Sequence, residues 1–190
     1  MLNDVMQALT TRKPISLTTT SLCSGSFTAR IARTQRLHVL RIAGFAMAGW
    51  ERLDHDVKAG LFRAYGLDVQ ATTLPDAAAA AAAISDDIAD VAFTDSLTAV
   101  RAHAQRIPMQ FIAIRDGMDF GYVGLAPVIE AKHYAMARFT RALRDKAYAG
   151  YVDSHTLQMV VDKFAAEKLI DEPFSVQEQI SRFAVMSGTR

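Results

Sequence analysis

Between His38 and Asp116, short apolar segments alternate with helical ones, and this alternation is the feature that most restricts the fold. The predicted strands cover residues 38–46, 67–74, 91–93 and 109–116, and the predicted helices between them cover 50–58, 77–84 and 97–105. Strands that alternate with helices at this spacing are typical of a parallel sheet with right-handed crossovers. We therefore predict an α/β fold.

Capping residues support these helix boundaries. Asp76 stands directly before a run of seven alanines, where its carboxylate can accept a hydrogen bond from a free backbone N–H group. Alanine is the best helix former, so this run predicts a helix. Thr94-Asp95-Ser96 forms a polar turn that predicts the start of the next helix. Gly66 is expected to end a helix in the left-handed conformation.

The C-terminal part of the chain is predicted to be helical. Residues 128–150 are expected to form one helix that ends at Gly150, and Asp153 is expected to cap the next one. In that last helix one apolar face contains Leu157, Val160, Val161 and Phe164. We predict three parts: a loose basic arm (1–37), an α/β ligand-binding lobe (38–126) and C-terminal packing helices (127–190).

The composition excludes several classes of protein. The single cysteine, Cys23, rules out an intrachain disulfide and argues against a thiolate metal site. A net charge of +1 does not indicate a polyanionic partner. The N-terminal arm is basic but lacks a helix-turn-helix pattern, so nucleic acid is not expected as a partner. No apolar run is long enough to span a membrane.

The N-terminal arm is not expected to be a secretory signal, because the segment LTTTSLCSGS is too polar to form the apolar block that such a signal needs. Two interpretations of the arm remain open. It resembles an organelle transit peptide in being rich in Arg and Ser and poor in acids, and it also fits non-native residues added by an upstream start codon.

The segment GWERLDHDVKAGLFRAYGLDVQATTL (49–74) resembles the first-lobe opening of a known family. These are the ABC-transporter substrate-binding proteins of the nitrate/sulfonate/taurine type, within the type II periplasmic-binding-protein and thiamine-pyrimidine-synthase-like superfamily. The matching residues are Gly60-Leu61-Phe62 and Gly66-Leu67-Asp68-Val69. Further along, Asp90-Val91-Ala92 and Ile107-Pro108-Met109 match two later strand starts, and residues 154–180 resemble the C-terminus of the family.

The resemblance implies a fold and a role. It implies a periplasmic, non-enzymatic substrate-binding component that delivers a small organic molecule to an ABC permease. The implied ligands are a sulfonate, nitrate, taurine or a pyrimidine-like compound. Family members have two lobes, whereas no second strand–helix–strand pattern follows Ile114. The chain therefore resembles a shortened member that lacks most of the second lobe.

In open α/β sheets, ligands bind beyond the carboxyl ends of the strands, and this places the candidate site in four loops. The candidate ligand-binding residues in these loops are Trp50, Asp76, Ala77, Thr94, Asp95, Ser96 and Arg115. Helix N-termini, hydroxyl groups and Arg115 suit an anion. The carboxylates of Asp76 and Asp95 instead favour a neutral or cationic ligand, unless both serve as helix caps. Two roles are open for Trp50: its ring either lines the ligand site or packs in the core.

Two other functions remain open. A thiamine-pyrimidine-synthase-like enzyme would need a cysteine-rich motif, which a chain with Cys23 alone lacks. A truncated lobe could instead act as a non-catalytic interaction module or homodimer, because it would expose a sheet edge or apolar face. No metal or cofactor is expected: within Asp54-His55-Asp56, adjacent helical side chains point in different directions.

Overall fold

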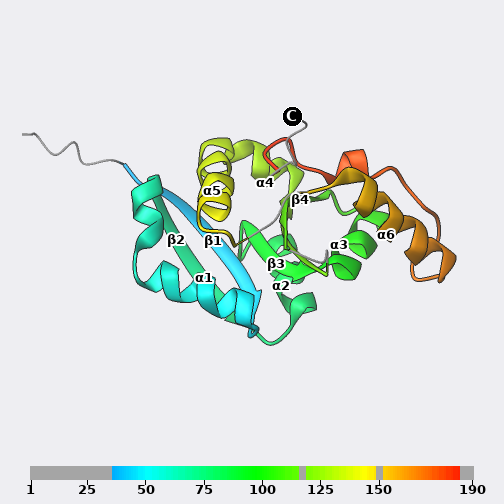
Figure 1. Cartoon of the computed structure of the whole chain (residues 1–190), viewed down its shortest axis with the longest axis horizontal. Coiled ribbons are helices and arrows are strands. Elements are labelled where there is room, and N and C mark those ends of the chain that lie inside the picture. Colours follow the sequence, from blue (N-terminus) through cyan, green and yellow to red (C-terminus); the bar gives the residue numbers. More distant parts are fainter. Residues whose placement is uncertain (1–35, 116–118, 149–151, 185–190) are drawn as a thin grey trace, which may run out of the picture. The chain divides into compact units, whose positions relative to one another are not determined.

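The computed structural model describes residues 36–115, 119–148 and 152–184. Nearly all of the predicted arm 1–37, including Cys23, lies outside the described residues, as do Asp116 and Gly150. The described residues form one five-stranded sheet in the order β2-β1-β3-β5-β4 (Figure 1). The strands are β1 (His38–Phe45), β2 (Leu67–Leu74), β3 (Val91–Asp95), β4 (Met109–Ile114) and β5 (Phe120–Leu125).

The sheet is mixed rather than wholly parallel. β1 pairs in parallel with both β2 and β3, whereas β5 pairs antiparallel with β3 on one side and β4 on the other. The four strands predicted from the sequence are therefore confirmed and run in one direction, and the predicted α/β class is confirmed with them. The sequence reasoning missed β5, which lies between β3 and β4.

Two glycines explain why β5 was missed. Gly121 and Gly124 lower the strand propensity of FGYVGL, although both glycines serve close packing. A β-carbon on Gly121 would lie 3.0 Å from the carbonyl oxygen of Ala113, and one on Gly124 would lie 3.0 Å from that of Asp90.

The helices follow the predicted order with one correction. They are α1 (Ala48–Lys58), α2 (Ala77–Ser85), α3 (Ser96–Ala104), α4 (Ala126–Ala131), α5 (His133–Asp145) and α6 (Ser154–Ala166), with the short 3-10 helices η1 (Leu61–Tyr65) and η2 (Val176–Gln179). The prediction of one helix over 128–150 is wrong. The chain breaks at Lys132, whose backbone leaves the helical region (φ −105°, ψ 28°), and its Nζ atom donates a hydrogen bond to Asp90 at 2.7 Å.

The predicted helix ends are confirmed where they depend on local contacts. Asp76 and Asp95 cap α2 and α3, and Asp153 accepts hydrogen bonds from His155 N and Thr156 N at the start of α6. Gly66 follows η1 with a φ of 73°, in the left-handed region that favours glycine. The predicted apolar face of α6 is also present, with Leu157 and Val161 buried and Phe164 half-buried.

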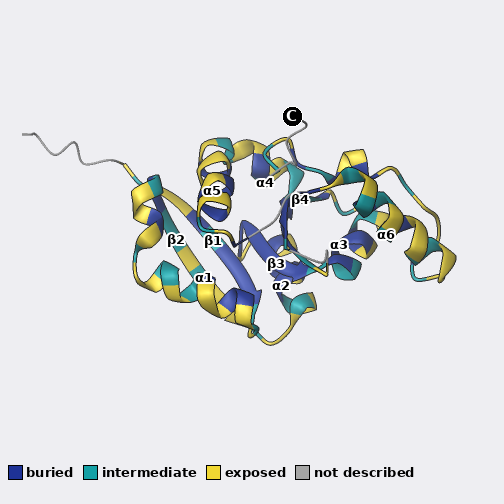
Figure 2. Ribbon diagram, in the orientation of Figure 1, coloured by how far each residue is buried: buried dark blue, intermediate teal, exposed yellow. Residues whose placement is uncertain are grey.

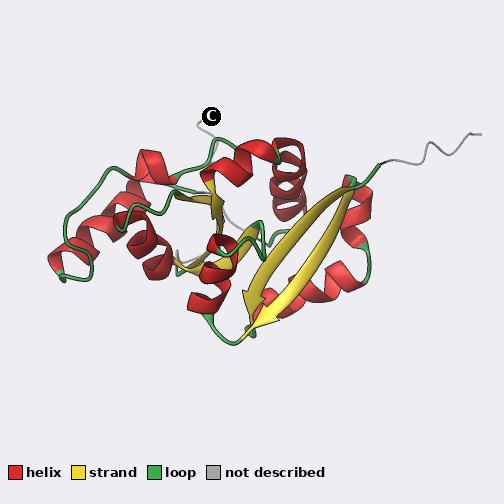
Figure 3. Ribbon diagram, turned by 180° about the vertical axis from the view of Figure 1, so that it is seen from behind, coloured by secondary structure: helices red, strands yellow, loops and turns green. Residues whose placement is uncertain are grey.

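The sheet separates two apolar cores (Figures 2 and 3). One core lies between the sheet and α1, η1, α4 and α5, and includes Trp50, Phe93 and Phe139. The other contains the alanines of α2, together with α3 and the buried face of α6. The small side chains of α2 let this helix lie close to β1 and β3.

C-terminal segments thus pack on both faces of the sheet, and the proposed boundary between residues 126 and 127 falls in the first turn of α4. The division into three parts stays a prediction. None of the described helices is long and apolar enough to cross a membrane.

Candidate ligand-binding site

The sheet topology brings several chain segments to one edge. β1, β2, β3 and β4 all end at this edge, and β5 begins there because it runs in the opposite direction. The starts of α1, α2 and α3 follow the ends of β1, β2 and β3 directly or after two linking residues. We call this region the carboxyl edge. It contains all seven residues predicted as candidate ligand contacts.

Two of the three helix N-termini at the carboxyl edge are capped by their own carboxylates. Asp76 Oδ1 accepts a hydrogen bond from Ala79 N at 2.7 Å. Asp95 accepts one from Thr98 N at 2.8 Å and another from the Thr98 hydroxyl at 2.6 Å. A carboxylate at this position satisfies free N–H groups and compensates the positive end of the helix dipole. α2 and α3 therefore already carry negative charge at their N-termini.

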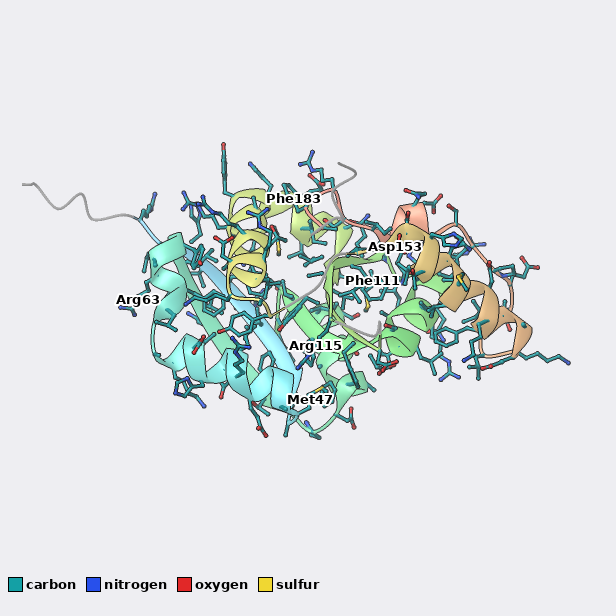
Figure 4. The ribbon with its side chains drawn as sticks, in the orientation of Figure 1. Met47, Arg63, Phe111, Arg115, Asp153 and Phe183 are labelled. Atoms are coloured by element: carbon teal, nitrogen blue, oxygen red, sulfur yellow. The ribbon has the colours of Figure 1, made fainter. Side chains whose placement is uncertain are left out.

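The N-terminus of α1 differs in this respect. Its capping residue is Met47, which makes no side-chain capping hydrogen bond. The guanidinium of Arg115, from the end of β4, lies against the first turn of α1, where a β-carbon on Gly49 would be 1.4 Å from Nη1. Figure 4 labels Met47 and Arg115 near this end of the helix.

This juxtaposition places two positive features together. Arg115 is half-buried and makes no salt bridge with any residue in the described part of the chain. The acidic residue in the first turn of α1 is Glu51, and its side chain is exposed. A cation beside a helix N-terminus opposes the helix dipole, so it is unfavourable unless an anion lies nearby. Burial raises the pKa of the Tyr122 hydroxyl, and the positive charge of Arg115 acts in the opposite direction.

Aromatic side chains lie at the same edge. The rings of Phe45 and Phe93 are 5.9 Å apart, and Phe120 lies 5.9 Å from Phe45 and 6.0 Å from Phe93. Phe93 is buried, whereas Phe45 and Phe120 are half-buried and present part of their surface at the edge. The carboxyl edge therefore combines a positively charged position with apolar surface.

The structure places several of the predicted contacts in packing roles. Trp50 is 1% exposed, and its Nε1 donates a hydrogen bond to Thr73 Oγ1 at 2.9 Å. Its ring stacks on Phe93, with centroids 6.4 Å apart. Thr94 is buried and donates a hydrogen bond from Oγ1 to the carbonyl of Ala77 at 2.8 Å, which joins the end of β3 to the start of α2.

Asp95 and Ser96 line a second feature, a hollow of about 220 Å³ between the start of α3 and α6. Ser96 is buried and its backbone N–H donates to the carbonyl of Asp119 at 3.0 Å. Lys163 and Phe164 of α6 form the opposite wall. These two residues of α6 were not predicted at the site, because α6 was expected only to pack against the lobe.

The sequence analysis also missed Phe45, Gly49 and Phe120. Gly49 follows the predicted strand 38–46 in a short segment of Ala and Gly residues. These small residues are the sequence signal that another side chain can come close to the backbone there. Phe120 could not be assigned to the edge because β5 itself was not predicted.

Comparisons with solved structures identify the fold. The periplasmic aliphatic sulphonate binding protein SsuA from Escherichia coli matches with a TM-score of 0.56 at 10% identity, covering 80% of this chain and 95% of that one. The alkanesulfonate-binding protein SsuA from Xanthomonas axonopodis pv. citri, bound to MOPS, matches with a TM-score of 0.51 at 8% identity, covering 75% and 98%. A Candida albicans protein described as having the generic periplasmic binding protein structural fold matches with a TM-score of 0.50 at 8% identity, covering 75% and 79%.

The fold is that of the periplasmic binding proteins. No protein-family model matches the chain, and no curated protein matches its sequence. At identities of 8–10%, this similarity shows the fold alone.

The acidic and histidine side chains of Asp54-His55-Asp56 lie in the second half of α1. His55 Nδ1 lies 3.2 Å from Asp56 Oδ1, and Tyr148 donates a hydrogen bond to the other carboxylate oxygen of Asp56. Within the ranges that the structure describes, no group of three or more His, Cys, Asp and Glu side chains could hold a metal ion.

Proposed function

We propose that this chain is the substrate-binding component of an ABC importer for a small organic anion, acting in the periplasm with a permease. The observation that carries the proposal is the position of Arg115 against Gly49, at the N-terminus of α1, where the N-cap residue Met47 makes no side-chain capping hydrogen bond. An anionic head group there would accept hydrogen bonds from free backbone N–H groups and pair with the guanidinium.

The surroundings of Arg115 support an anion in preference to a cation. The sequence alone left the charge of the ligand open, because Asp76 and Asp95 were expected at the same edge. In the structure both carboxylates accept hydrogen bonds from their own helices, so they are engaged as caps. The half-buried rings of Phe45 and Phe120 offer a surface for an apolar tail. A sulfonate or carboxylate with a short organic group fits this combination better than nitrate or an aminopyrimidine.

The fold supports a binding role over catalysis. The solved structures with this fold include two sulfonate-binding proteins, one of them a complex with the sulfonate buffer MOPS. The alternative of a thiamine-pyrimidine-synthase-like enzyme would require a cysteine-rich motif, and the whole chain contains one cysteine.

Calorimetric titration of the full chain tests the proposal. The panel contains taurine, longer alkanesulfonates, nitrate, aromatic carboxylates and aminopyrimidines. We expect binding of an alkanesulfonate or carboxylate, and we expect Arg115→Met to weaken it by about tenfold to a hundredfold, which corresponds to the loss of one hydrogen-bonded charge. A bound ligand should also raise the melting temperature, because a hundredfold excess of ligand over Kd stabilises the folded chain by about 2.7 kcal/mol.

Arg141→Met is the matched control, because Arg141 is an exposed arginine on α5 that lies 3.6 Å from Asp145. It removes the same charge from the chain and should leave affinity unchanged. Equal losses of ligand affinity in the two variants would show that the effect comes from the net charge of the chain. Tight binding of an aminopyrimidine with no effect of Arg115→Met would overturn the anion site.

A further inference from the structure

A hollow of about 930 Å³ lies at the edge of the sheet opposite the carboxyl edge. α3 starts at the carboxyl edge and runs away from it, and β4 runs back toward it, so residues 105–108 between them mark the opposite edge. One wall of the hollow is the last turn of α3, and the other is the loop that leads from α6 to η2 (Figure 1). We call this feature the α3 hollow. Its volume is within the range of small-molecule sites, about 300–1,000 Å³.

Contacts between the two walls fix the shape of the α3 hollow. Arg101 Nε on α3 donates a hydrogen bond to the carbonyl of Leu169 on the loop at 3.1 Å. The rings of His103 on α3 and Phe174 on the loop have their centroids 4.6 Å apart. Gln158 Nε2 on α6 donates a hydrogen bond to the carbonyl of Phe174 at 3.0 Å, which ties the loop to α6. The α3 hollow is therefore a preformed feature of the fold, as small-molecule sites usually are.

The charged side chains of the α3 hollow have opposite sign on its two walls. Arg101 and Arg106 belong to the wall formed by the end of α3, and Asp171, Glu172 and Glu178 belong to the wall formed by the loop and η2. All five residues are exposed. Within the described ranges, none of the five takes part in an ion pair. Charges of both signs thus line one hollow without neutralising each other.

Several groups on the α3 wall have hydrogen-bonding capacity that the described part of the chain does not use. Arg101 uses only its Nε atom, so its two terminal nitrogens have no partner there. Arg106, whose backbone has a φ of 65° in the left-handed region, makes no side-chain hydrogen bond to a described residue. Nδ1 of His103 is buried and also lacks a partner among the described residues. Buried polar atoms are usually paired, so an unpaired one calls for an explanation such as a bound molecule.

The two signs decide the charge of the ligand. A simple anion would be attracted by the arginines but repelled by the three carboxylates, and a simple cation would meet the reverse. A molecule that carries both an anionic group and a protonated amine is complementary to both walls at once. The half-buried side chains of Ile107 and Phe174 offer apolar surface in the same hollow for the rest of such a molecule.

We propose that the α3 hollow binds a small zwitterion of the size of an amino acid or a dipeptide. The carboxylate of the ligand pairs with the two arginines of the α3 wall, and its ammonium group lies near the three carboxylates of the opposite wall. This site is separate from Arg115 at the carboxyl edge, so it stands independently of the proposed transport role.

Calorimetric titration of the full chain tests both charges of the ligand. The probes are leucine and leucyl-leucine, whose apolar side chains suit the apolar surface of the hollow. N-acetyl-leucine keeps only the negative charge, and leucinamide keeps only the positive one. We expect a zwitterion to bind, and each singly charged compound to bind about fivefold more weakly or worse. The tighter of the two zwitterions shows whether an amino acid or a dipeptide fits. No binding of either zwitterion at millimolar concentration, or equal binding of a singly charged compound, would overturn the proposal.

Arg106→Met tests the basic wall. Because this side chain is exposed and makes no ion pair with a described residue, the variant should keep the melting temperature and weaken zwitterion binding by about fivefold. Arg144→Met, at an exposed arginine of α5, is the matched control and should leave the affinity unchanged. Arg115→Met should also leave it unchanged. Loss of zwitterion binding in Arg115→Met rather than in Arg106→Met would place the zwitterion at the carboxyl edge and overturn the proposal.

Asp171→Asn/Glu172→Gln tests the acidic wall. The double variant should weaken zwitterion binding by about fivefold and reduce the preference over N-acetyl-leucine, because the ammonium group loses two partners. Glu51→Gln/Asp86→Asn removes the same charge at exposed positions outside the hollow and should leave the affinity unchanged. If the two double variants bind the zwitterion equally well, the acidic wall does not contact it and the proposal is wrong.

Discussion

The carboxylate of Asp90 lies 2.7 Å from the Nη2 atom of Arg41, at a position where Asp90 is only 1% exposed. Lys132 Nζ donates a hydrogen bond to the other carboxylate oxygen, also at 2.7 Å. Burial alone would raise the pKa of Asp90, but the hydrogen bonds from Arg41 and Lys132 outweigh it and hold the pKa below its ordinary value. This cluster joins β1, the start of β3 and the break between α4 and α5.

Asp90→Asn is expected to destabilise the fold. The substitution keeps the shape of the side chain but leaves Arg41 and Lys132 without their shared partner. Because both cations are about one-third exposed, water compensates part of the loss, and we expect a cost of about 2–3 kcal/mol in the free energy of unfolding. Urea denaturation measures it. Asp87→Asn is the control, since Asp87 pairs with the same Arg41 but is exposed, and its effect should be small. Equal effects of the two variants would contradict the role of burial.

The same cluster predicts how stability depends on pH. In the unfolded chain the pKa of an aspartate is about 3.9, whereas in the folded chain that of Asp90 is lower. The unfolded state therefore binds the proton more readily, and acidification favours unfolding. The contribution is fully present above about pH 4 and disappears as the pH falls through the folded-state value. Urea titrations at decreasing pH should show a shallower acid loss in Asp90→Asn than in the wild type.

Part of that acid loss should persist in the variant. The pKa of Asp56 is also lowered, chiefly because Tyr148 donates a hydrogen bond to it. Parallel stability curves for wild type and Asp90→Asn would show that Asp90 does not contribute to acid sensitivity.

Gly44→Ala should disrupt the packing of Trp50. A β-carbon on Gly44 would lie 2.1 Å from Cε3 of the indole, inside the core, so either the ring or the strand must move. Such overpacking costs about 1–3 kcal/mol. Trp50 is the only tryptophan in the chain, so its fluorescence reports the change directly, and we expect a red shift together with a lower melting temperature.

Gly60→Ala separates packing from backbone strain. Gly60 has a φ of 72°, and the nearest atom to an added β-carbon is 3.8 Å away. This variant should cost about 1 kcal/mol through backbone strain and leave the fluorescence maximum unchanged. An unshifted spectrum in Gly44→Ala would contradict the close contact with Trp50.

Asp76→Ala should weaken the start of α2. The variant removes the acceptor for Ala79 N, and loss of such a cap typically costs about 1 kcal/mol. Asp76→Ser retains a capping oxygen and should stay near the wild type in urea denaturation. If the two variants are equally unstable, the carboxylate charge rather than the capping hydrogen bond stabilises the helix.

Much of the local structure could be predicted because it depends on neighbouring residues. β2 occupies the predicted residues 67–74, and Asp76, Asp95, Asp153 and Gly66 end or begin their elements as expected. A cap bonds to backbone groups within three residues, so its partners are visible in the sequence.

Features that depend on distant contacts were harder to predict. β5 contains glycines that oppose strand formation, yet they allow close approach between neighbouring strands. The helix predicted over residues 128–150 breaks where Lys132 reaches Asp90, a residue that precedes a different strand. In both places a tertiary contact overrides the local preference of the chain.

The sequence by itself determined the order of the strands and helices from β1 to β4, the helix caps and the edge of the sheet to which the candidate residues belong. Only the tertiary structure decided which of those residues meet. Trp50 packs against Gly44 and Phe93 in the core, and Arg115 lies against Gly49. The physical reason is that capping is settled within one turn of helix, whereas the pairing of Arg115 with α1 requires β4 to end beside a helix encoded far earlier in the chain.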